Sequence, residues 1–200
     1  MRKSFRTSVT SFLAAASLFV SVSAKTPAPP QSATAPLAAA ASTIGIDNFG
    51  VVNANYFRGA QPTGDDFARL KKLGVKLVID LAKEGASGEG AAVERAGMKF
   101  VRIPLTTSAA PSADVIEQFL TLVNDRANQP VYVHCMGGKH RTGAMTAVYR
   151  MTADGVTADQ AFKEMKQYKF GADFLHPELK AFVYSFYSEF ASKGGRDLRP

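Results

Sequence analysis

Apolar runs of strand length alternate with amphipathic segments from residue 44 onward, and this order predicts strands that are separated by helices. The predicted strands are 51–57, as one strand or a pair of short strands, 75–81, 99–103 and 130–134. The predicted helices are 65–73, 90–96, 113–127, 144–151, 157–168 and 177–190. Such an order implies parallel strands with right-handed crossovers, and a binding site at the carboxyl ends of the strands.

The expected fold is therefore α/β: a single domain with a central, mostly parallel sheet of four to five strands flanked by helices on both faces. Residues typical of helix ends support these limits. Gly74 and Gly97 follow two of the helices, Ser112 and Thr157 are suited to begin two others, and Pro177 stands in a first helical turn. The domain is expected to span residues 44–192, a usual size for one core, with a tail at 193–200.

The first 24 residues have the three parts of a secretory signal peptide: a basic start, an apolar stretch over residues 9–22, and small residues before a cleavage site after Ala24. Residues 25–43 are rich in Pro, Ala, Ser and Thr and are expected to form a linker. The apolar stretch is short for a permanent membrane helix, so no stable membrane insertion is expected after cleavage, with a retained anchor as the alternative. The mature domain is therefore expected in the periplasm or outside the cell.

The net charge and the cysteine content limit which partners and which covalent cross-links are expected. The formal net charge is +7, and three of these positive charges lie in the signal segment, which leaves +4 for residues 25–200. The basic character thus belongs partly to targeting, and no nucleic-acid partner is expected. The single cysteine, Cys135, cannot form an internal disulfide, so the fold depends on its apolar core. The domain is expected to be a monomer.

The most informative segment is HCMGGKHRTG at residues 134–143, which joins the last predicted strand to a buried helix. Its glycines allow successive backbone N–H groups to converge on one point, and the helix adds the positive end of its dipole. Arg141 adds a planar fork for two phosphate oxygens. We therefore expect a phosphate-binding loop. The residues expected around the ligand are Met136, Gly137, Gly138, Lys139 and His140.

Cys135 stands at the start of this loop, where N–H dipoles and basic side chains favour its thiolate. A thiolate that faces phosphorus permits covalent catalysis, in which a phosphocysteine forms, the leaving group departs, and water then releases phosphate. Thr142 is expected to hydrogen-bond the sulfur and help it leave. The chemistry requires no cofactor, and no metal site is expected, because the chain has three histidines, one cysteine and no ligand spacing.

The string HCMGGKHRTG resembles the signature of the cysteine-dependent protein tyrosine and dual-specificity phosphatases, H-C-x5-R followed by Ser or Thr, at every fixed position. Within that superfamily the loop is most similar to the plant and fungal atypical dual-specificity phosphatases. The segments YFRGAQP at 56–62 and VIDL at 78–81 resemble those of bacterial and fungal members. The resemblance spans about residues 49–190. It implies a cysteine phosphatase-like fold and the hydrolysis of phosphate monoesters on phosphoproteins or inositol phosphates.

The resemblance also implies an aspartate about thirty residues before the cysteine, which protonates the leaving oxygen, yet the segment 103–111 contains no acid. Asp114 is the nearest candidate, and its alternative role is to stabilise the first turn of a helix. Asp80, at the end of a strand, is a second candidate, with a structural hydrogen bond as the alternative. Because a phosphate leaving group needs little protonation, an inositol pyrophosphate phosphoanhydride is an alternative substrate.

Two other functions stay open. A phosphate-binding module with weak or absent turnover would keep the same loop. A rhodanese-like sulfurtransferase also carries a cysteine loop after a strand, but rarely with this His-Cys and Arg-Thr-Gly framing.

Three further features have less specific interpretations. His134 is expected to tune the cysteine loop through hydrogen bonds. Arg58 follows two aromatic residues and either approaches phosphate or forms a structural salt bridge. The aromatic residues between 168 and 190, Phe174 among them, recur near helical spacing and are expected in the core.

Overall fold

The computed structural model describes residues 43–195. The predicted signal segment 1–24, the linker up to residue 42 and residues 196–200 of the predicted tail lie outside these described residues. The strands are β1 (Gly50–Asn53), β2 (Tyr56–Gly59), β3 (Leu77–Ala82), β4 (Lys99–Leu105) and β5 (Val131–His134). The α-helices are α2 (Asp66–Lys72), α3 (Glu89–Arg95), α4 (Ala113–Asn124), α5 (His140–Tyr149), α6 (Ala158–Gln167) and α7 (Pro177–Ser192). Within residues 43–195, no helix combines the length and the apolar character that a membrane crossing requires.

The strands form one sheet in the order β1-β2-β5-β3-β4. β2, β5, β3 and β4 are parallel, whereas β1 pairs antiparallel with β2. His134, the last residue of β5, is in register with Gly59 at the end of β2 and with Asp80 of β3. The carboxyl ends of three neighbouring strands therefore meet beside the segment that follows His134. This arrangement confirms the predicted α/β fold and its mostly parallel sheet.

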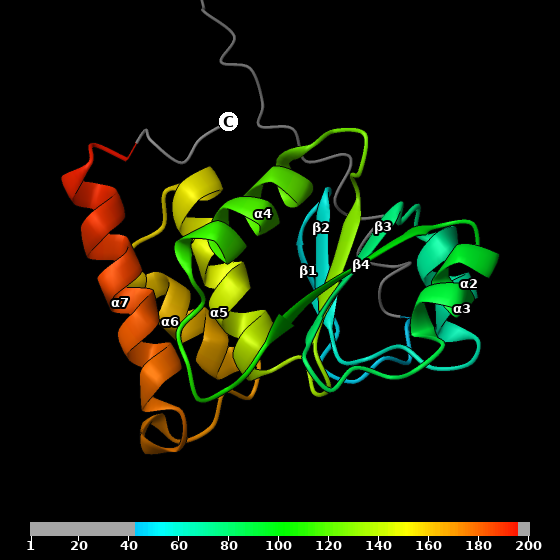
Figure 1. Cartoon of the computed structure of the whole chain (residues 1–200), viewed down its shortest axis with the longest axis horizontal. Helices are drawn as coiled ribbons and strands as arrows, with labels where there is room; N and C mark the ends of the chain where they lie inside the picture. Colours follow the sequence, from blue (N-terminus) through cyan, green and yellow to red (C-terminus); the bar gives the residue numbers. More distant parts are fainter. Residues whose placement is uncertain (1–42, 196–200) are drawn as a thin grey trace, which may run out of the picture. The chain divides into compact units, whose positions relative to one another are not determined.

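Helices cover both faces of the sheet, with α2 and α3 on one face and α4, α5, α6 and α7 on the other (Figure 1). Successive residues of a strand point to opposite faces, so one apolar strand contributes to two cores. In β5, Val131 and Val133 belong to the larger core with α4–α7, and Tyr132 belongs to the smaller core with α2 and α3. Because β5 is buried on both faces, its residues 131–133 form a nearly continuous apolar run.

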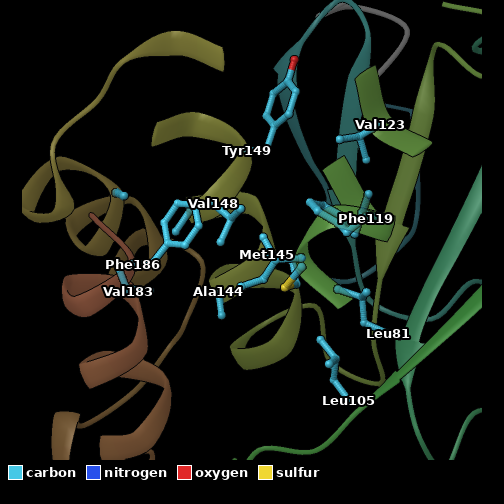
Figure 2. Packing of buried hydrophobic residues seen from close by; sticks show 14 of the residues in the cluster. Leu81, Leu105, Phe119, Val123, Ala144, Met145, Val148, Tyr149, Val183 and Phe186 are labelled. Carbon is cyan, nitrogen blue, oxygen red and sulfur yellow. The ribbon is translucent and has the colours of Figure 1, made fainter. Parts of the chain in front are cut away.

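α5 is the central helix of the larger core. All of its residues after His140 are buried, because it packs against the sheet and against α4, α6 and α7. Met145 and Val148 belong to one cluster with Phe119 of α4 and Phe186 of α7 (Figure 2). Burial on all sides fixes this helix in place, and with it the position of its N-terminus, where the cysteine loop ends.

The predicted elements are present, and the main differences lie at their ends. As expected, the Ser112 side chain accepts from the Val115 N–H, and Thr157 forms a capping box with Gln160. The helix predicted for 113–127 ends at Asn124, because Asp125 is extended and its carboxylate instead accepts from the N–H of Ala127.

Two expectations are corrected by the structure. α5 begins at His140 rather than at residue 144, with the Gly143 N–H bonded to Lys139 O, so residues 140–143 of the expected loop form the first turn of the helix. Phe174 is 79% exposed and does not belong to the core. It lies in a 3₁₀ turn, Asp173–Leu175, before α7 begins, so the helical repeat that places later aromatic residues inside does not extend to it.

Candidate active site

Cys135 is the first residue after β5, at the point where the parallel strands end. It is only 3% exposed, and α5 begins five residues later at His140. The loop between them turns at Gly138, whose φ is +64°. A Cβ at Gly138 would overlap the carbonyl group of Gly59 and lie 2.6 Å from the nitrogen of Ala60. Only glycine therefore allows the loop to pack this closely against the end of β2.

Three consecutive carbonyl groups of the loop are held from its outer side. The Gln61 N–H donates to Met136 O over 3.2 Å, and Asn48 Nδ2 donates to Gly138 O over 2.9 Å and to Gly137 O over 3.4 Å. In a trans peptide the N–H points opposite to the carbonyl, so the three N–H groups of these peptides face away from their donors. None of them donates to a partner within the described residues. They form a nest for an anion at the start of α5.

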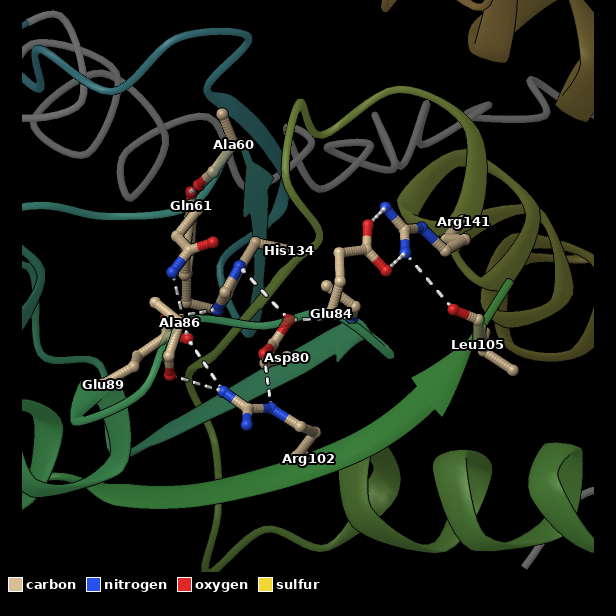
Figure 3. Close-up of polar contacts among 12 residues, drawn as sticks. Ala60, Gln61, Asp80, Glu84, Ala86, Glu89, Arg102, Leu105, His134 and Arg141 are labelled. Carbon is tan, nitrogen blue, oxygen red and sulfur yellow. Dashed lines mark hydrogen bonds and ion pairs between the residues drawn. The ribbon is translucent and has the colours of Figure 1, made fainter. Parts of the chain in front are cut away.

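Arg141 lies in the first turn of α5 and binds Glu84 through both of its terminal nitrogens (Figure 3). The Nη1–Oε2 distance is 2.7 Å and the Nη2–Oε1 distance is 2.6 Å, and Nη1 also donates to Leu105 O over 3.2 Å. The bonds from Arg141 lower the pKa of Glu84 to about 2. The Nε of Arg141 is buried and has no hydrogen-bond partner among the described residues. Glu84 thus fixes the plane of the guanidinium and leaves its Nε edge available to a ligand.

His134 lies behind the loop in a buried group of charged side chains (Figure 3). Its Nε2 is 3.0 Å from Glu89 Oε1, and its Nδ1 is 3.8 Å from Asp80 Oδ1. Arg102 Nε donates to Asp80 Oδ2 over 2.7 Å, and Arg102 Nη2 lies 3.6 Å from Glu89 Oε2. Asp80 also accepts from the N–H of Ala82 over 2.8 Å. Asp80 is therefore engaged in structural contacts.

The same three side chains have the composition of a metal site. Asp80, Glu89 and His134 bring one potential ligand atom each within 4.8 Å of one another. The guanidinium of Arg102 stands against both carboxylates and offsets part of their charge. A metal ion would have to displace this guanidinium, so the contacts fit an ion-pair network better than a metal site.

The basic residues of the loop lie at its rim. Lys139 and His140 are half-buried, and Met136 is 50% exposed. His140 Nε2 lies 3.0 Å from Phe170 O, and its ring contacts the ring of His176 at a centroid distance of 3.8 Å. Burial lowers the pKa of His140 from its ordinary value, and the charge of His176 lowers it further. The imidazole of His140 is therefore uncharged at neutral pH.

Thr142 lies next to the loop, whereas Asp114 lies in a different cleft. The Oγ1 of Thr142 is buried and forms no hydrogen bond within the described residues, so the expected bond to the Cys135 sulfur is not made in this structure. Asp114 is exposed in the first turn of α4 and lines an open cleft with Val101 and Glu117, at the outer edge of the sheet. The residues around Asp114 come from α4 and β4, not from the loop. Its role as general acid stays a prediction.

Three polar residues that shape the site were not identified from the sequence: Asn48, Glu84 and Glu89. Glu84 follows the carboxyl end of β3, so its place in the sheet offered a signal. Asn48 precedes β1, and Glu89 begins α3. No pattern in the sequence indicates that these two reach the cysteine loop and its histidine.

Two relatives each align with more than half of the chain. Inositol diphosphatase DSP2 of Oryza sativa subsp. japonica is 32% identical over 117 residues, which are 56% of this chain and 57% of that protein. Dual specificity protein phosphatase TpbA of Pseudomonas aeruginosa is 28% identical over 127 residues, which are 64% of this chain and 57% of that protein. The chain therefore spans 57% of the length of each relative.

Solved structures share the fold. The core catalytic domain of the PP-IP phosphatase SIW14 from S. cerevisiae superposes with a TM-score of 0.61 at 21% identity, over 78% of this chain and 98% of that one. P. aeruginosa TpbA superposes with a TM-score of 0.61 at 23% identity, over 72% of this chain and 91% of that one. A family model described as "DSP-PTPase phosphatase fused to NAD+ Kinase" matches residues 42–180, which is more than half of the chain. The chain therefore belongs to this family of DSP-PTPase phosphatases.

Proposed function

We propose that this protein is a cysteine-dependent phosphatase that hydrolyses phosphate monoesters through a phosphocysteine intermediate. The observation that carries the proposal is the loop itself. Cys135 opens a turn in which three consecutive N–H groups have no partner among residues 43–195, at the N-terminus of a fixed helix. Arg141 keeps a buried Nε beside that turn, which is likewise unpartnered in this part of the chain. A tetrahedral dianion satisfies all of these donors at once.

The reaction proceeds in two steps that use these groups. The Cys135 thiolate attacks phosphorus, a sulfur–phosphorus bond forms, and the bond from phosphorus to the leaving oxygen breaks with its electron pair on that oxygen. Water then attacks phosphorus, the sulfur–phosphorus bond breaks, and inorganic phosphate and the thiolate are released. The loop N–H groups and Arg141 stabilise the charge on the three remaining oxygens in both steps.

Protonation of the leaving oxygen decides which substrates turn over fastest. Asp114 is the proposed acid, and it lies in the cleft between α4 and β4. An enzyme with a weakly placed acid favours leaving groups that depart without a proton, such as phenolate or phosphate. Phosphotyrosine and inositol pyrophosphates therefore rank above phosphoserine as proposed substrates. Names of relatives support both classes, since one is an inositol diphosphatase and another a dual specificity protein phosphatase.

The test is phosphate release by the chain from p-nitrophenyl phosphate, a phosphotyrosine peptide, phytate and an inositol pyrophosphate. Cys135→Ser is the matched variant, because it replaces the nucleophilic sulfur and leaves the loop backbone in place. We expect turnover in the native protein, loss of turnover in Cys135→Ser, and a trapped phosphocysteine after rapid acid quench. Tight phosphate binding without turnover on any substrate would instead identify a phosphate-binding module.

The proposal includes export to the periplasm or the exterior, on the basis of the signal pattern in residues 1–24. Intact-mass measurement of the protein from fractionated cells tests this location. A periplasmic or secreted product that begins at Lys25 is expected. A cytoplasmic product that retains residues 1–24, or residues 2–24 after loss of Met1, would contradict this location.

A further inference from the structure

Arg58 is a fully buried cation directly behind the cysteine loop. It lies on β2, one residue before Gly59, and is in register with Val133 of the central strand. Its exposed fraction is 0%, and its Nη2 donates to Gly138 O over 3.0 Å. Its Nε and Nη1 have no hydrogen-bond partner among the described residues. A guanidinium that is buried with two unpartnered nitrogens is costly, so its charge requires a compensating group.

The groups around Arg58 supply little of that compensation. Its guanidinium stacks 3.9 Å from the centre of the Tyr168 ring, and the pKa values of Tyr168 and Tyr56 are raised by burial, so both phenols are neutral. Glu164 is the acid that interacts with Arg58 through charge, and it is already paired with Arg150 Nε at 3.0 Å. The Cys135 side chain also interacts with Arg58 through charge, after Tyr56, Tyr168 and Glu164 in size, and it belongs to the loop whose backbone Arg58 contacts.

The hydrogen bond from Arg58 also acts on the shape of the loop. Gly138 O accepts from both Arg58 and Asn48, and Asn48 Nδ2 in turn donates to Tyr168 O over 2.9 Å. These donors hold the carbonyl of Gly138 outward, so the Lys139 N–H of the same peptide is turned toward the side where phosphate would bind. One side chain thus supplies positive charge and fixes the direction of a loop dipole.

We propose that Arg58 is a positioning residue of the anion site: acting from behind the loop, its charge stabilises the Cys135 thiolate and the bound phosphate, and its Nη2 orients the peptide after Gly138. The inference deepens the proposed phosphatase function, because it concerns the same loop. Of the two sequence expectations for Arg58, the structural salt bridge is not observed within the described residues, because the guanidinium instead reaches the loop backbone.

The experiment measures the rate at which iodoacetamide alkylates the protein as a function of pH. The chain has one cysteine, so the rate reports Cys135 alone and requires no turnover. The other charged or titratable groups that face or adjoin Cys135 are Arg141 of α5, Tyr132 of β5 and the neighbouring His134. All three are unchanged in the variants, so a displaced profile is assigned to Arg58.

Two variants separate charge from hydrogen bonding. Arg58→Gln keeps an N–H donor for Gly138 O but removes the charge, and it is expected to move the alkylation midpoint up by about one pH unit. It should also weaken the binding of inorganic phosphate, measured by calorimetry, by roughly tenfold or more. Arg58→Lys keeps the charge and should retain most of the native alkylation profile. Arg126→Gln, at an exposed arginine in the turn after α4, is the control for net charge.

Several results would overturn the proposal. A native alkylation midpoint and native phosphate affinity in Arg58→Gln would show that the charge does not act on the site. Equal losses in the Gln and Lys variants, or failure of both to fold, would make Arg58 a structural residue only. If the native protein has no turnover on any substrate, the proposed function fails, yet the alkylation profiles still decide the role of Arg58.

Discussion

Glu84 holds Arg141 by the two terminal nitrogens and leaves its Nε without a partner in the part of the chain that the structure describes. An arginine guanidinium presents two N–H groups side by side on two of its edges, the edge between Nη1 and Nη2 and the edge between Nε and Nη2. A phosphate is bound best through one of these edges. Glu84 uses the edge between Nη1 and Nη2, so the edge between Nε and Nη2 stays available. The carboxylate thus directs the arginine rather than occupying the position of the ligand.

We therefore expect Glu84→Gln to lower kcat/KM by about tenfold, because an amide orients a guanidinium less firmly than a carboxylate does. The low pKa of Glu84, about 2, means that its charge does not change between pH 5 and pH 8. The loss in the variant should therefore be the same across that range. Steady-state kinetics with p-nitrophenyl phosphate at several pH values measures both the loss of kcat/KM and its dependence on pH.

Glu94→Gln, an exposed acid at the end of α3, is the matched control for loss of one negative charge. A rise in phosphate affinity in Glu84→Gln would mean that the carboxylate competes with the ligand, and the orienting role would then be wrong.

Gly138 and Gly137 offer a matched pair of substitutions within the loop. Gly138→Ala places a Cβ against the backbone of Gly59 and Ala60 at a residue with φ of +64°, so the loop must move. We expect the binding of inorganic phosphate to weaken by tenfold or more, roughly the effect of losing one oriented N–H donor. In Gly137→Ala the new Cβ meets only the Lys139 side chain, at 3.5 Å or more, and binding should stay near the native value. Equal effects in both variants, measured by calorimetry, would contradict this role of Gly138.

The fold was predictable because the signals for its elements are local. These signals are apolar runs of strand length, the capping residues Ser112 and Thr157, and Pro177. Each of them acts on residues that are close to it in the sequence. Ends were less predictable where a side chain competes with the helix, as Asp125 does by accepting from Ala127. The start of α5 at His140 was missed, because glycines and a basic run in the sequence are typical of loops.

Within the site, only the residues of the HCMGGKHRTG signature were predictable. Cys135 and Arg141 follow from residue spacing, and the structure places Cys135 directly after β5 and Arg141 in the first turn of α5. Asn48, Glu84 and Glu89 reach the same loop or its histidine from elements 45 to 90 residues away, and such contacts leave no periodic trace in one sequence. The placement of Asp114 depends on the direction of a side chain in a helical turn, which residue order alone does not determine.

Arg102 is expected to be essential for stability rather than for chemistry. It is partly exposed, whereas the side chains of Asp80 and Glu89, which it joins, are 0% and 1% exposed. Arg102→Met removes the arginine from two buried carboxylates, which keep only His134, the N–H of Ala82 on Asp80 and the amide of Gln61 on Glu89 as partners among the described residues. We expect the free energy of unfolding, measured in urea, to fall by about 3 kcal/mol. Arg95→Met, an exposed arginine at the end of α3, is the control. A loss below about 1 kcal/mol, typical of a surface pair, would contradict the importance of this network.

His140 gives the folded protein a specific pH dependence. Burial and the charge of His176 lower its pKa below the ordinary value of 6.5, so the unfolded chain binds a proton more readily than the folded one. The stability linked to His140 is therefore fully present above pH 6.5 and is lost as the pH falls toward the lowered value. We expect the Tm to fall less between pH 7 and pH 5 in His140→Gln than in the native protein. His176→Gln, which keeps His140 but removes the neighbouring imidazole, should give an intermediate slope. A His140→Gln profile parallel to that of the native protein would show that His140 does not contribute to the acid sensitivity.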